Sequence, residues 1–342
     1  MRHRTFFWFT LPSAVAMILF IALPILSVLV QSLHIEHERV VVMTETCDPF
    51  GCKKETRVDA EATQKLLQAE PLGRFNGLGT YFNRKHLAST EFAEAWQNAS
   101  GFSDFLGRLM NLPFYKALFF SLAYLAVVTP LVIVLGFLIA LAVDGLAGAV
   151  KGPVIFTSLL PMIITPLVGS LVLFWMIDSS GVIGAMIQKL AGDPNLSLKA
   201  SSQLTWLTLF AYGVWHSAPF AFVVFYAGLQ TVPQDTLESA MVDGASRWER
   251  VRYVVLPHLA PLAVFIALIQ LMDNFRVFEP IVGFSAEAHA TSLSWAIYSD
   301  LRSTGAPNFG SAAATSMLTI LGVCILLTPV LIRTWRDFNR GR

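Results

Sequence analysis

The chain has 342 residues, of which 55% are hydrophobic and only 14% are charged. Because ordinary globular domains contain about 25% charged residues, this composition excludes an ordinary soluble enzyme. The net charge is +1, from 24 Lys and Arg against 23 Asp and Glu, and it indicates neither a nucleic-acid partner nor an acidic one. The apolar residues occur in blocks of about twenty or more, and these blocks predict an integral membrane protein.

Six apolar stretches are long enough to cross a bilayer as helices, since a hydrocarbon core of about 30 Å takes roughly 20 residues. They run over Phe6–Leu33, Phe114–Val143, Val154–Ile177, Gln203–Leu229, Pro261–Phe284 and Ser311–Ile332. Several contain proline, whose freed carbonyl must be satisfied in lipid by a neighbouring helix or a water-lined cavity. We therefore expect an all-α integral membrane protein with six transmembrane helices.

The orientation of the spans follows from the Lys and Arg residues in the short flanking segments, because cytoplasmic loops keep positive charge. The short outer loops carry only Lys189, Lys199 and Arg302. If the N-terminus lies inside, the inner segments carry ten Lys and Arg residues: Arg2, Arg4, Lys151, Arg247, Arg250, Arg252, Arg333, Arg336, Arg340 and Arg342. This asymmetry predicts that both termini lie in the cytoplasm and that the 79-residue segment from His34 to Leu112 lies outside.

The N-terminal apolar stretch is predicted to be a retained anchor rather than a cleaved signal peptide. Arg2 and Arg4 precede it, as in a signal peptide, but the stretch is about twice as long as a signal h-region and no Ala-x-Ala-like site follows. The expected organisation is an N-terminal transmembrane helix over residues 1–33, a periplasmic loop or cap over 34–112, and a core of five further helices over 113–342.

The predicted periplasmic segment has the pattern of a small folded cap. A β-branched run, Val40–Val42, precedes a turn at Asp48–Gly51, and a polar, helix-compatible stretch follows over Asp59–Glu70. Cys47 and Cys52 flank the turn, and a hairpin brings such a pair within disulfide distance. Outside the cytoplasm the pair can stay oxidised, so we expect a disulfide; the alternatives are two free thiols or a metal site, for which no nearby His or Cys completes a zinc ligand set.

Between the fourth and fifth predicted spans lies a cytoplasmic loop, residues 230–258, that is too apolar for a floppy connection and too polar to span. Its pattern predicts a helix over Gln234–Val242, a bend at Gly244, and a second short helix that Ser246 caps and that ends before Pro257. A bent pair of helices on the inner face favours docking to another protein.

This loop resembles the Glu-Ala-Ala loop of ABC importer permeases, in which a glycine follows the second alanine by four residues and a Leu-Pro pair comes further on. The residues that carry the resemblance are Glu238, Ser239, Ala240, Asp243, Gly244, Ala245, Leu256 and Pro257. Ser239 stands where the motif usually has alanine, and both side chains are small. The resemblance implies that the loop is the coupling helix, which fits a groove on a cytoplasmic ATPase and transmits its closing motion to the membrane helices.

Further stretches resemble the carbohydrate-uptake branch of that family, which includes the maltose and glycerol-3-phosphate permeases. They are the Asp-Gly-Ala triplet, AGLQTVP before the loop, WHSAPFAF in the fourth span and NGLGTYF before the second span. Where that branch usually has a Gly-Gly-Pro turn after the fifth span, this chain has SAEAHATS. The resemblance implies a permease subunit of a binding-protein-dependent importer that moves a sugar, oligosaccharide or polyol derivative across the inner membrane.

The resemblance also implies partners: a second permease subunit, two copies of an ATPase that bind ATP and Mg, and a periplasmic solute-binding protein. The sequence has no Gly-Lys-Ser/Thr phosphate loop, and neither His-Glu-x-x-His nor Gly-x-Ser-x-Gly occurs, so we expect a transport subunit without catalytic residues, metal or cofactor of its own. Two alternatives stay open. One is an ABC permease for a polyamine, phosphate or sulfonate, and the other is an ion-coupled secondary transporter, although no internal repeat is evident.

The fifth and fourth spans carry the candidate residues of a translocation path. Asp273, Asn274, Arg276 and Glu279 lie in the fifth span, where ionisable side chains are costly and usually functional. They either line the path, form a structural ladder of ion pairs along one helix face near the periplasmic end, or bond to the partner permease. Trp215 in the fourth span either stacks on a sugar ring or packs between helices, and His216 beside it is expected to be a satisfied polar group between helices.

Overall fold

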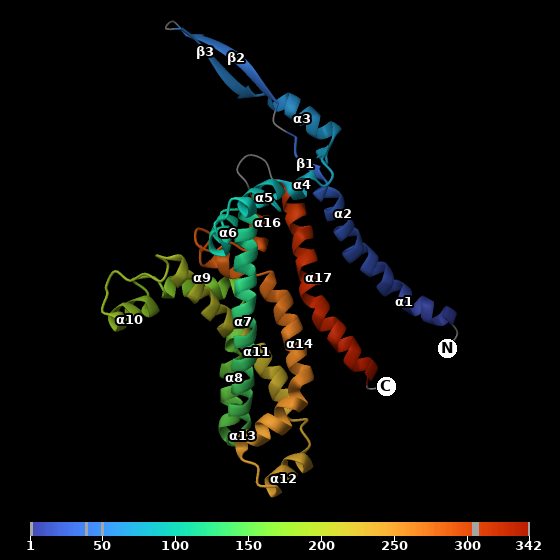
Figure 1. Ribbon diagram of the computed structural model, residues 1–342, viewed down its shortest axis with the longest axis vertical. Helices are drawn as coiled ribbons and strands as arrows, with labels where there is room; N and C mark the ends of the chain where they lie inside the picture. The colour runs from blue at the N-terminus through green and yellow to red at the C-terminus, as the bar shows by residue number, and fades with distance from the viewer. Residues whose placement is uncertain (1–2, 38–39, 49–50, 303–307, 341–342) are drawn as a thin grey trace. The chain divides into compact units, whose positions relative to one another are not determined.

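The computed structural model describes residues 3–37, 40–48, 51–302 and 308–340, most of them in helices (Figure 1). Two compact units are present. The first unit comprises residues 1–115 and 296–320, and the second comprises residues 116–295 and 321–342.

Among the described residues, five helical segments are long and apolar enough to cross a membrane, and six are if one bent pair counts as a span. The first consists of α1 (His3–Met17), a π-helix (Ile18–Ala22) and α2 (Leu23–Ser32). The others are α7 (Pro113–Asp144), α11 (Ser202–Leu229), α14 (Leu256–Phe275), which residues 247–255 lead into, and α17 (Phe309–Arg340). These spans confirm the prediction of an all-α membrane protein.

The third predicted span is not one continuous helix. α8 (Gly148–Ile163) and α9 (Pro166–Met176) form the bent pair, and they meet at an angle of 95°. Ile164 and Thr165 between them are extended, with ψ of 129° and 143°. The residue before a proline is disfavoured in the helical region, so Pro166 accounts for the break at Thr165 and begins the new helix.

The fifth predicted span is also shorter than expected. α14 ends at Phe275, residues 276–278 leave the helix, and the short helix α15 (Glu279–Gly283) follows. Pro280 lies in the first turn of α15, a position that proline favours and that a continuous helix would not tolerate. Asp273 and Glu279 therefore lie on different helices, and the predicted ladder along one helix face is wrong.

The cytoplasmic loop leads directly into the fifth span. α13 (Arg247–Arg250), a π-helix (Val251–Val255) and α14 follow one another without a break. The prediction that the second helix ends before Pro257 is therefore wrong. In the π-helical turn the Leu256 N–H donates to the Val251 carbonyl, five residues back, and this wider turn makes room in front of a proline that would crowd a regular helix. The same arrangement precedes Pro24, where Leu23 donates to Ile18.

The core of the second unit is formed by large apolar side chains from α7, α11 and α14. Figure 1 shows these helices, and α11 packs against both α8 and α14. Less than 2% of the surface is exposed for Phe120, Leu209, Phe222 and Ile266. α7 and α11 approach closely at Gly136, as is typical of membrane helices that pack through small residues.

The first unit contains the segment predicted to be a cap. β2 (Val41–Asp48) and β3 (Gly51–Val58) form an antiparallel hairpin, and α3 (Ala60–Ala69) begins after Asp59, whose side chain accepts hydrogen bonds from two backbone N–H groups of the first turn. The register pairs Cys47 with Cys52, but their side chains lie outside the described residues, so the disulfide stays a prediction.

The remaining elements of the chain are β1 (His34–Ile35), β4 (Arg74–Phe75), α4 (Gly79–Phe82), α5 (Ser89–Gln97), α6 (Phe102–Leu109), α10 (Val182–Ala191), α12 (Gln234–Val242) and α16 (Leu293–Leu301).

A buried histidine ties the loop after α4 to the start of α17 within the first unit. His86 is completely buried, its Nδ1 lies 2.8 Å from the Asn83 Oδ1, and its Nε2 lies 3.1 Å from the Ser311 carbonyl oxygen. Burial lowers the pKa of His86, and the hydrogen bond to Ser311 opposes that shift only in part. His86 therefore fixes the beginning of the last span against residues that lie more than two hundred positions earlier in the chain.

We expect Gly136→Ala to destabilise the protein because the new Cβ would lie 2.5 Å from the Ala221 Cβ and 2.8 Å from the Phe222 nitrogen. Overpacking of this kind costs about 1–3 kcal/mol. The thermal unfolding midpoint of the purified protein in detergent measures the effect. Gly107→Ala in α6 is the control, since a Cβ there meets nothing within 4 Å and alanine is favoured in helices. Equal midpoints for wild type and Gly136→Ala would contradict the close approach.

Candidate functional site

The predicted coupling loop begins with α12, whose bounds, Gln234–Val242, are those expected from the sequence. Pro233 precedes the helix in an extended conformation, and Asp235 lies in the first turn, where the helix dipole favours a carboxylate. No residue of α12 is buried. Glu238 and Ser239 are exposed, and the Ser239 hydroxyl donates to the Asp235 carbonyl at 2.8 Å. α12 thus leaves Glu238 and Ser239 open on the surface of this chain, while Leu237 packs partly against the core.

A specific C-terminal cap explains why the loop has glycine at position 244. The Ala245 N–H donates to the Ala240 carbonyl at 2.9 Å, and the Gly244 N–H donates to the Met241 carbonyl at 3.0 Å. This pair of bonds is the Schellman motif, which requires a left-handed residue directly after the helix cap at Asp243. Gly244 has φ +83°, which glycine adopts without steric cost. The spacing of Ala240, Asp243, Gly244 and Ala245 is therefore the spacing of a helix terminus.

The second half of the loop is held by a capping box. The Glu249 N–H donates to the Ser246 Oγ at 3.3 Å, and the Ser246 N–H donates to the Glu249 carboxylate at 2.7 Å. From Arg247 the helix continues through Leu256 and Pro257 into the fifth span. A displacement of the loop is therefore transmitted to α14 through a continuous helix.

The surface beside α12 is hollowed and acidic. Asp235, Glu238, Ser239, Val242 and Asp243 line an open hollow there. Exposed apolar side chains adjoin the carboxylates, since Val242 is 87% exposed and Trp248, on the following helix, is 67% exposed. Apolar side chains that are this exposed beside a polar rim are typical of protein interaction sites.

The polar residues predicted in the fifth span have different surroundings. An Arg276 guanidinium nitrogen lies 2.9 Å from the Asp273 Oδ1, and both side chains are about half exposed. Asn274 is buried, and its Nδ2 donates to the Thr129 Oγ1 at 3.0 Å on α7. Glu279 is exposed on α15, and the described residues contain no ion pair between it and Arg276. The structure therefore brings Asp273 and Arg276 together, makes Asn274 a tie between helices, and leaves Glu279 apart from both.

Side chains of α11 satisfy the backbone at the break between α8 and α9. The Tyr212 hydroxyl donates to the Pro166 carbonyl at 2.6 Å, and the His216 Nε2 lies 3.2 Å from the Ile164 carbonyl oxygen. His216 is thus the satisfied polar group that the sequence indicates. Trp215 is 42% exposed, and its ring centroid lies 6.0 Å from that of Tyr212. In the described residues no hydrogen bond or ring contact links Trp215 to the polar residues of the fifth span.

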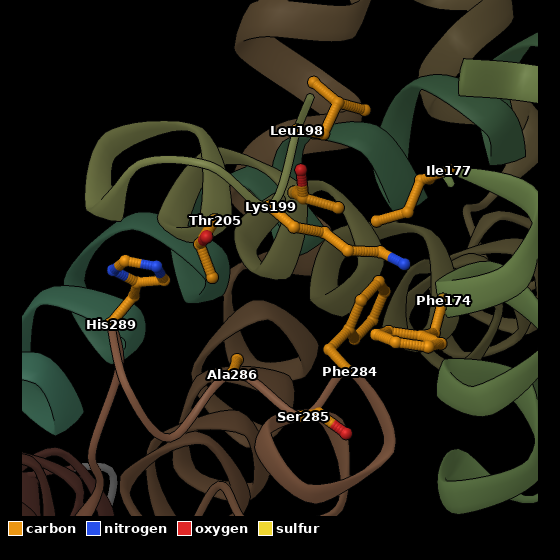
Figure 2. Close-up of a pocket in the computed structure, with 10 residues that line it drawn as sticks. Phe174, Ile177, Leu198, Lys199, Thr205, Phe284, Ser285, Ala286 and His289 are labelled. Atoms are coloured by element: carbon orange, nitrogen blue, oxygen red, sulfur yellow. The ribbon is translucent and has the colours of Figure 1, made fainter. Parts of the chain in front are cut away.

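A pocket that sequence reasoning missed lies between the end of α9, the start of α11 and the segment after α15 (Figure 2). It is lined by Phe174, Ile177, Leu198, Lys199, Thr205, Thr208, Phe284, Ser285, Ala286 and His289. These residues come from four separate stretches of the chain, and no local motif marks them. The pocket is therefore a product of the tertiary fold.

Lys199 crosses this pocket and is paired on two sides. Its Nζ lies 2.9 Å from the Asp178 Oδ2 and 3.3 Å from the centroid of the Phe174 ring. The hydrogen bond from Lys199, together with those from Ser180, lowers the pKa of Asp178 to about 2. The carboxylate is therefore ionised at any physiological pH, and the pair carries no net charge. Within the described part of the chain no group of His, Cys, Asp and Glu residues is arranged to hold a metal ion.

We expect Tyr212→Phe to destabilise the second unit because the hydrogen bond that ties α11 to the start of α9 is lost. Hydrogen bonds between membrane helices contribute about 0.6–1.7 kcal/mol, which should lower the thermal unfolding midpoint of the detergent-solubilised protein. Tyr226→Phe, on the same helix, is the matched control, because the described residues contain no hydrogen bond from the Tyr226 hydroxyl. If both variants melt together with the wild type, the Tyr212 bond does not support the break.

Comparisons with known proteins agree with these features. A family model described as the binding-protein-dependent transport system inner membrane component matches residues 99–333. The diacetylchitobiose uptake system permease protein DasB of Streptomyces coelicolor is 26% identical over 280 residues, which cover 80% of this chain and 83% of DasB. The sn-glycerol-3-phosphate transport system permease protein UgpA of Shigella flexneri is 30% identical over 180 residues, which cover 51% of this chain and 59% of UgpA.

A solved structure shares the fold. The crystal structure of a bacterial ABC transporter involved in the import of the acidic polysaccharide alginate contains a chain that matches with a TM-score of 0.61. The match covers 81% of this chain and 97% of that chain, at 19% sequence identity. Because the family model covers more than half of the sequence and the fold agrees with it, the chain belongs to the inner-membrane permease components of binding-protein-dependent ABC transport systems, which are transport subunits and not enzymes.

Proposed function

We propose that this chain is the permease subunit of an ATP-driven importer that carries a sugar, oligosaccharide or polyol derivative across the inner membrane. The carbohydrate class is supported by the Asp-Gly-Ala triplet over residues 243–245 and by similarity to DasB and UgpA. The Arg276 side chain supports a neutral solute because Asp273 already pairs with it.

The cytoplasmic loop is the observation that carries this proposal. No residue of α12 is buried, the cap around Gly244 sets the turn towards the next helix, and that helix continues into α14. An exposed helix that is joined rigidly to a membrane span is what a coupling element requires. The residues assigned to this role are Glu238, Ser239, Ala240, Asp243, Gly244, Ala245, Leu256 and Pro257.

The proposed assembly contains three kinds of partner. A second, different permease subunit completes the path, two ATPase subunits bind ATP and Mg and dock at the coupling loops, and a periplasmic protein delivers the solute. ATP binding closes the ATPases and moves α12, and the capped turn after it passes the movement to the helix that runs without a break from Arg247 into α14. The path then alternates between inward-open and outward-open states, each selected by the ligands that bind it better.

Within this assembly the exposed polar and aromatic residues are proposed to line the path. Trp215, Asp273, Arg276 and Glu279 are exposed in this chain, and hydroxyl groups of a sugar could bond to the three charged side chains. Asn274 is assigned a structural role instead, since its amide is buried against Thr129 and Gln270. The hairpin with Cys47 and Cys52 is proposed to be a disulfide-closed periplasmic cap.

One observation favours a second candidate, a permease for an anionic solute such as phosphate or sulfonate. Arg276 is 54% exposed, and its guanidinium could exchange Asp273 for a bound anion. The alternative of an ion-coupled secondary transporter does not agree with the family to which the chain belongs.

Affinity purification of the tagged chain from membranes in mild detergent tests the proposal, with mass spectrometry of the partners and an ATPase assay. We expect an ATPase and a second permease to co-purify. Reconstitution of this complex with its binding protein then allows uptake to be measured for maltose, trehalose, diacetylchitobiose and glycerol 3-phosphate. A chain that purifies alone and without ATPase activity would contradict the assembly, and a functional complex that takes up only phosphate or sulfonate would assign the second candidate.

Gly244→Trp is expected to uncouple ATP hydrolysis from uptake. No atom lies within 4 Å of a Cβ at this position, so the variant acts through the left-handed backbone and through its bulk at the docking face. A left-handed residue other than glycine costs about 1–2 kcal/mol. Gly244→Asn is the control, because asparagine adopts this conformation more readily. Unchanged uptake and assembly in Gly244→Trp would disprove the assignment of the coupling loop.

Arg276→Ala separates a lining role from a structural one. If Arg276 lines the path, the partners still co-purify but uptake falls by at least about tenfold. This is the effect expected from the loss of one charge-assisted hydrogen bond. Asp273→Asn is the matched variant, since it removes the other half of the same ion pair. Normal uptake in Arg276→Ala would remove this residue from the path, and loss of assembly would make it structural.

A further inference from the structure

The pocket of Figure 2 contains a buried hydroxyl group that no atom of the protein satisfies. Thr205 is 7% exposed, and its Oγ1 has no hydrogen-bond partner among the residues that the structure describes. The neighbouring Thr208 also lines the pocket, but its hydroxyl donates to the Leu204 carbonyl at 2.8 Å. A buried hydroxyl without a partner is unfavourable. Thr205 therefore faces a space in which a water molecule or a ligand group completes its bonding.

The walls of the pocket are of two chemical kinds. Figure 2 shows Thr205 and His289 on one side, the rings of Phe174 and Phe284 on the other, and the Lys199 side chain reaching towards the rings. The Phe174 ring is covered by the Lys199 ammonium at 3.3 Å, and the Phe284 ring packs edge-to-face with Tyr212 at 5.6 Å, so only the part of Phe284 that lines the pocket is left for a ligand. The pocket thus presents a hydroxyl group opposite an aromatic ring.

The charges around the pocket compensate each other. Lys199 is paired with Asp178 at 2.9 Å, and the lowered pKa of Asp178 keeps that carboxylate ionised. An anion would have to displace Asp178, and a cation would be repelled by Lys199. His289 is engaged through its Nδ1 with the Ser202 hydroxyl at 3.2 Å. The local balance therefore favours an uncharged ligand that carries hydroxyl groups.

The size of the pocket limits how much of such a ligand it can hold. Its volume is about 60 Å³, which is room for about four water molecules at roughly 15 Å³ each. That space fits a hydroxymethyl group and a neighbouring ring hydroxyl, but not a whole disaccharide. We propose that the pocket is a subsite that receives one hydroxyl-bearing edge of the transported carbohydrate, with Thr205 bonding a sugar hydroxyl and Phe284 facing the C–H surface of the ring.

This subsite deepens the proposed function and depends on it. The pocket is built from residues within 174–208 and 284–289, segments that the predicted orientation of the spans places on the outer side, where the solute arrives. None of its residues belongs to the coupling loop or to the polar group of the fifth span. It would therefore affect which sugars are accepted and not whether ATP hydrolysis is coupled to movement.

The proposal is tested by a cycle of the double-mutant type, in which the Thr205 hydroxyl and one sugar hydroxyl are removed first singly and then together. The reconstituted complex, with its own binding protein, takes up the best-transported sugar of the panel and each of its monodeoxy analogues. Wild type is expected to prefer the parent sugar over one analogue by about three- to tenfold, the usual effect of one hydrogen bond. In Thr205→Val this preference should fall to about one. Because the binding protein is the same in both measurements, only the change in the ratio reports on the pocket.

Three further variants make the result decisive. Thr205→Ser keeps the hydroxyl and should keep the preference, whereas Thr157→Val, whose hydroxyl donates to the Pro153 carbonyl away from the pocket, should leave it unchanged. Thr205→Ala removes the same hydroxyl and replaces Thr205→Val if the valine variant does not assemble. If the ratio for every analogue is the same with and without the Thr205 hydroxyl, the pocket holds only water and the proposal is overturned. If wild type takes up no sugar of the panel, the carbohydrate function itself fails, and the subsite with it.

Discussion

The membrane part of this protein depends on one constraint: every backbone polar group inside lipid needs a partner within the protein. The break between α8 and α9 illustrates this constraint, because carbonyl groups at the end of α8 lose their helical donors there. The His216 Nε2 on α11 lies 3.2 Å from one of them, that of Ile164, and the Tyr212 hydroxyl donates to the Pro166 carbonyl at the start of α9. Side chains of α11 therefore hold the backbone on both sides of the 95° bend.

The connection between the cytoplasmic face and the membrane follows from similar local chemistry. At Gly244 a left-handed residue ends α12 and turns the chain, and at Ser246 a capping box starts the next helix. The π-helical turn before Leu256 then lets that helix pass Pro257 without ending. The glycine cap, the capping box and the π-helical turn are each local. Together they connect α12 to the fifth span through one short turn and one unbroken helix.

Four charged side chains near the proposed path form two neutral pairs, whereas Glu279 has no ion pair among the described residues. Asp273 pairs with Arg276, and Asp178 pairs with Lys199. An isolated charge in a region of low polarity would be costly, and it would also bind counter-ions in place of an uncharged solute. Paired charges instead leave a polar, uncharged surface, which agrees with a carbohydrate as the proposed cargo.

Hydropathy and cap chemistry in the sequence by themselves determined where the unbroken spans and the coupling helix lie, because both act over a few neighbouring residues. No end of α7 or α11 differs by more than one residue from the predicted spans, Phe114–Val143 and Gln203–Leu229. The bounds of α12 agree with the prediction. The break after Phe275 was also signalled locally, by Pro280, but hydropathy alone masked it. Only the tertiary structure decided which residues meet: Tyr212 and Pro166 are 46 positions apart, and the pocket at Thr205 draws on four distant segments. Such contacts depend on the distance between packed helices, and the hydrophobic periodicity of a single helix does not predict that distance.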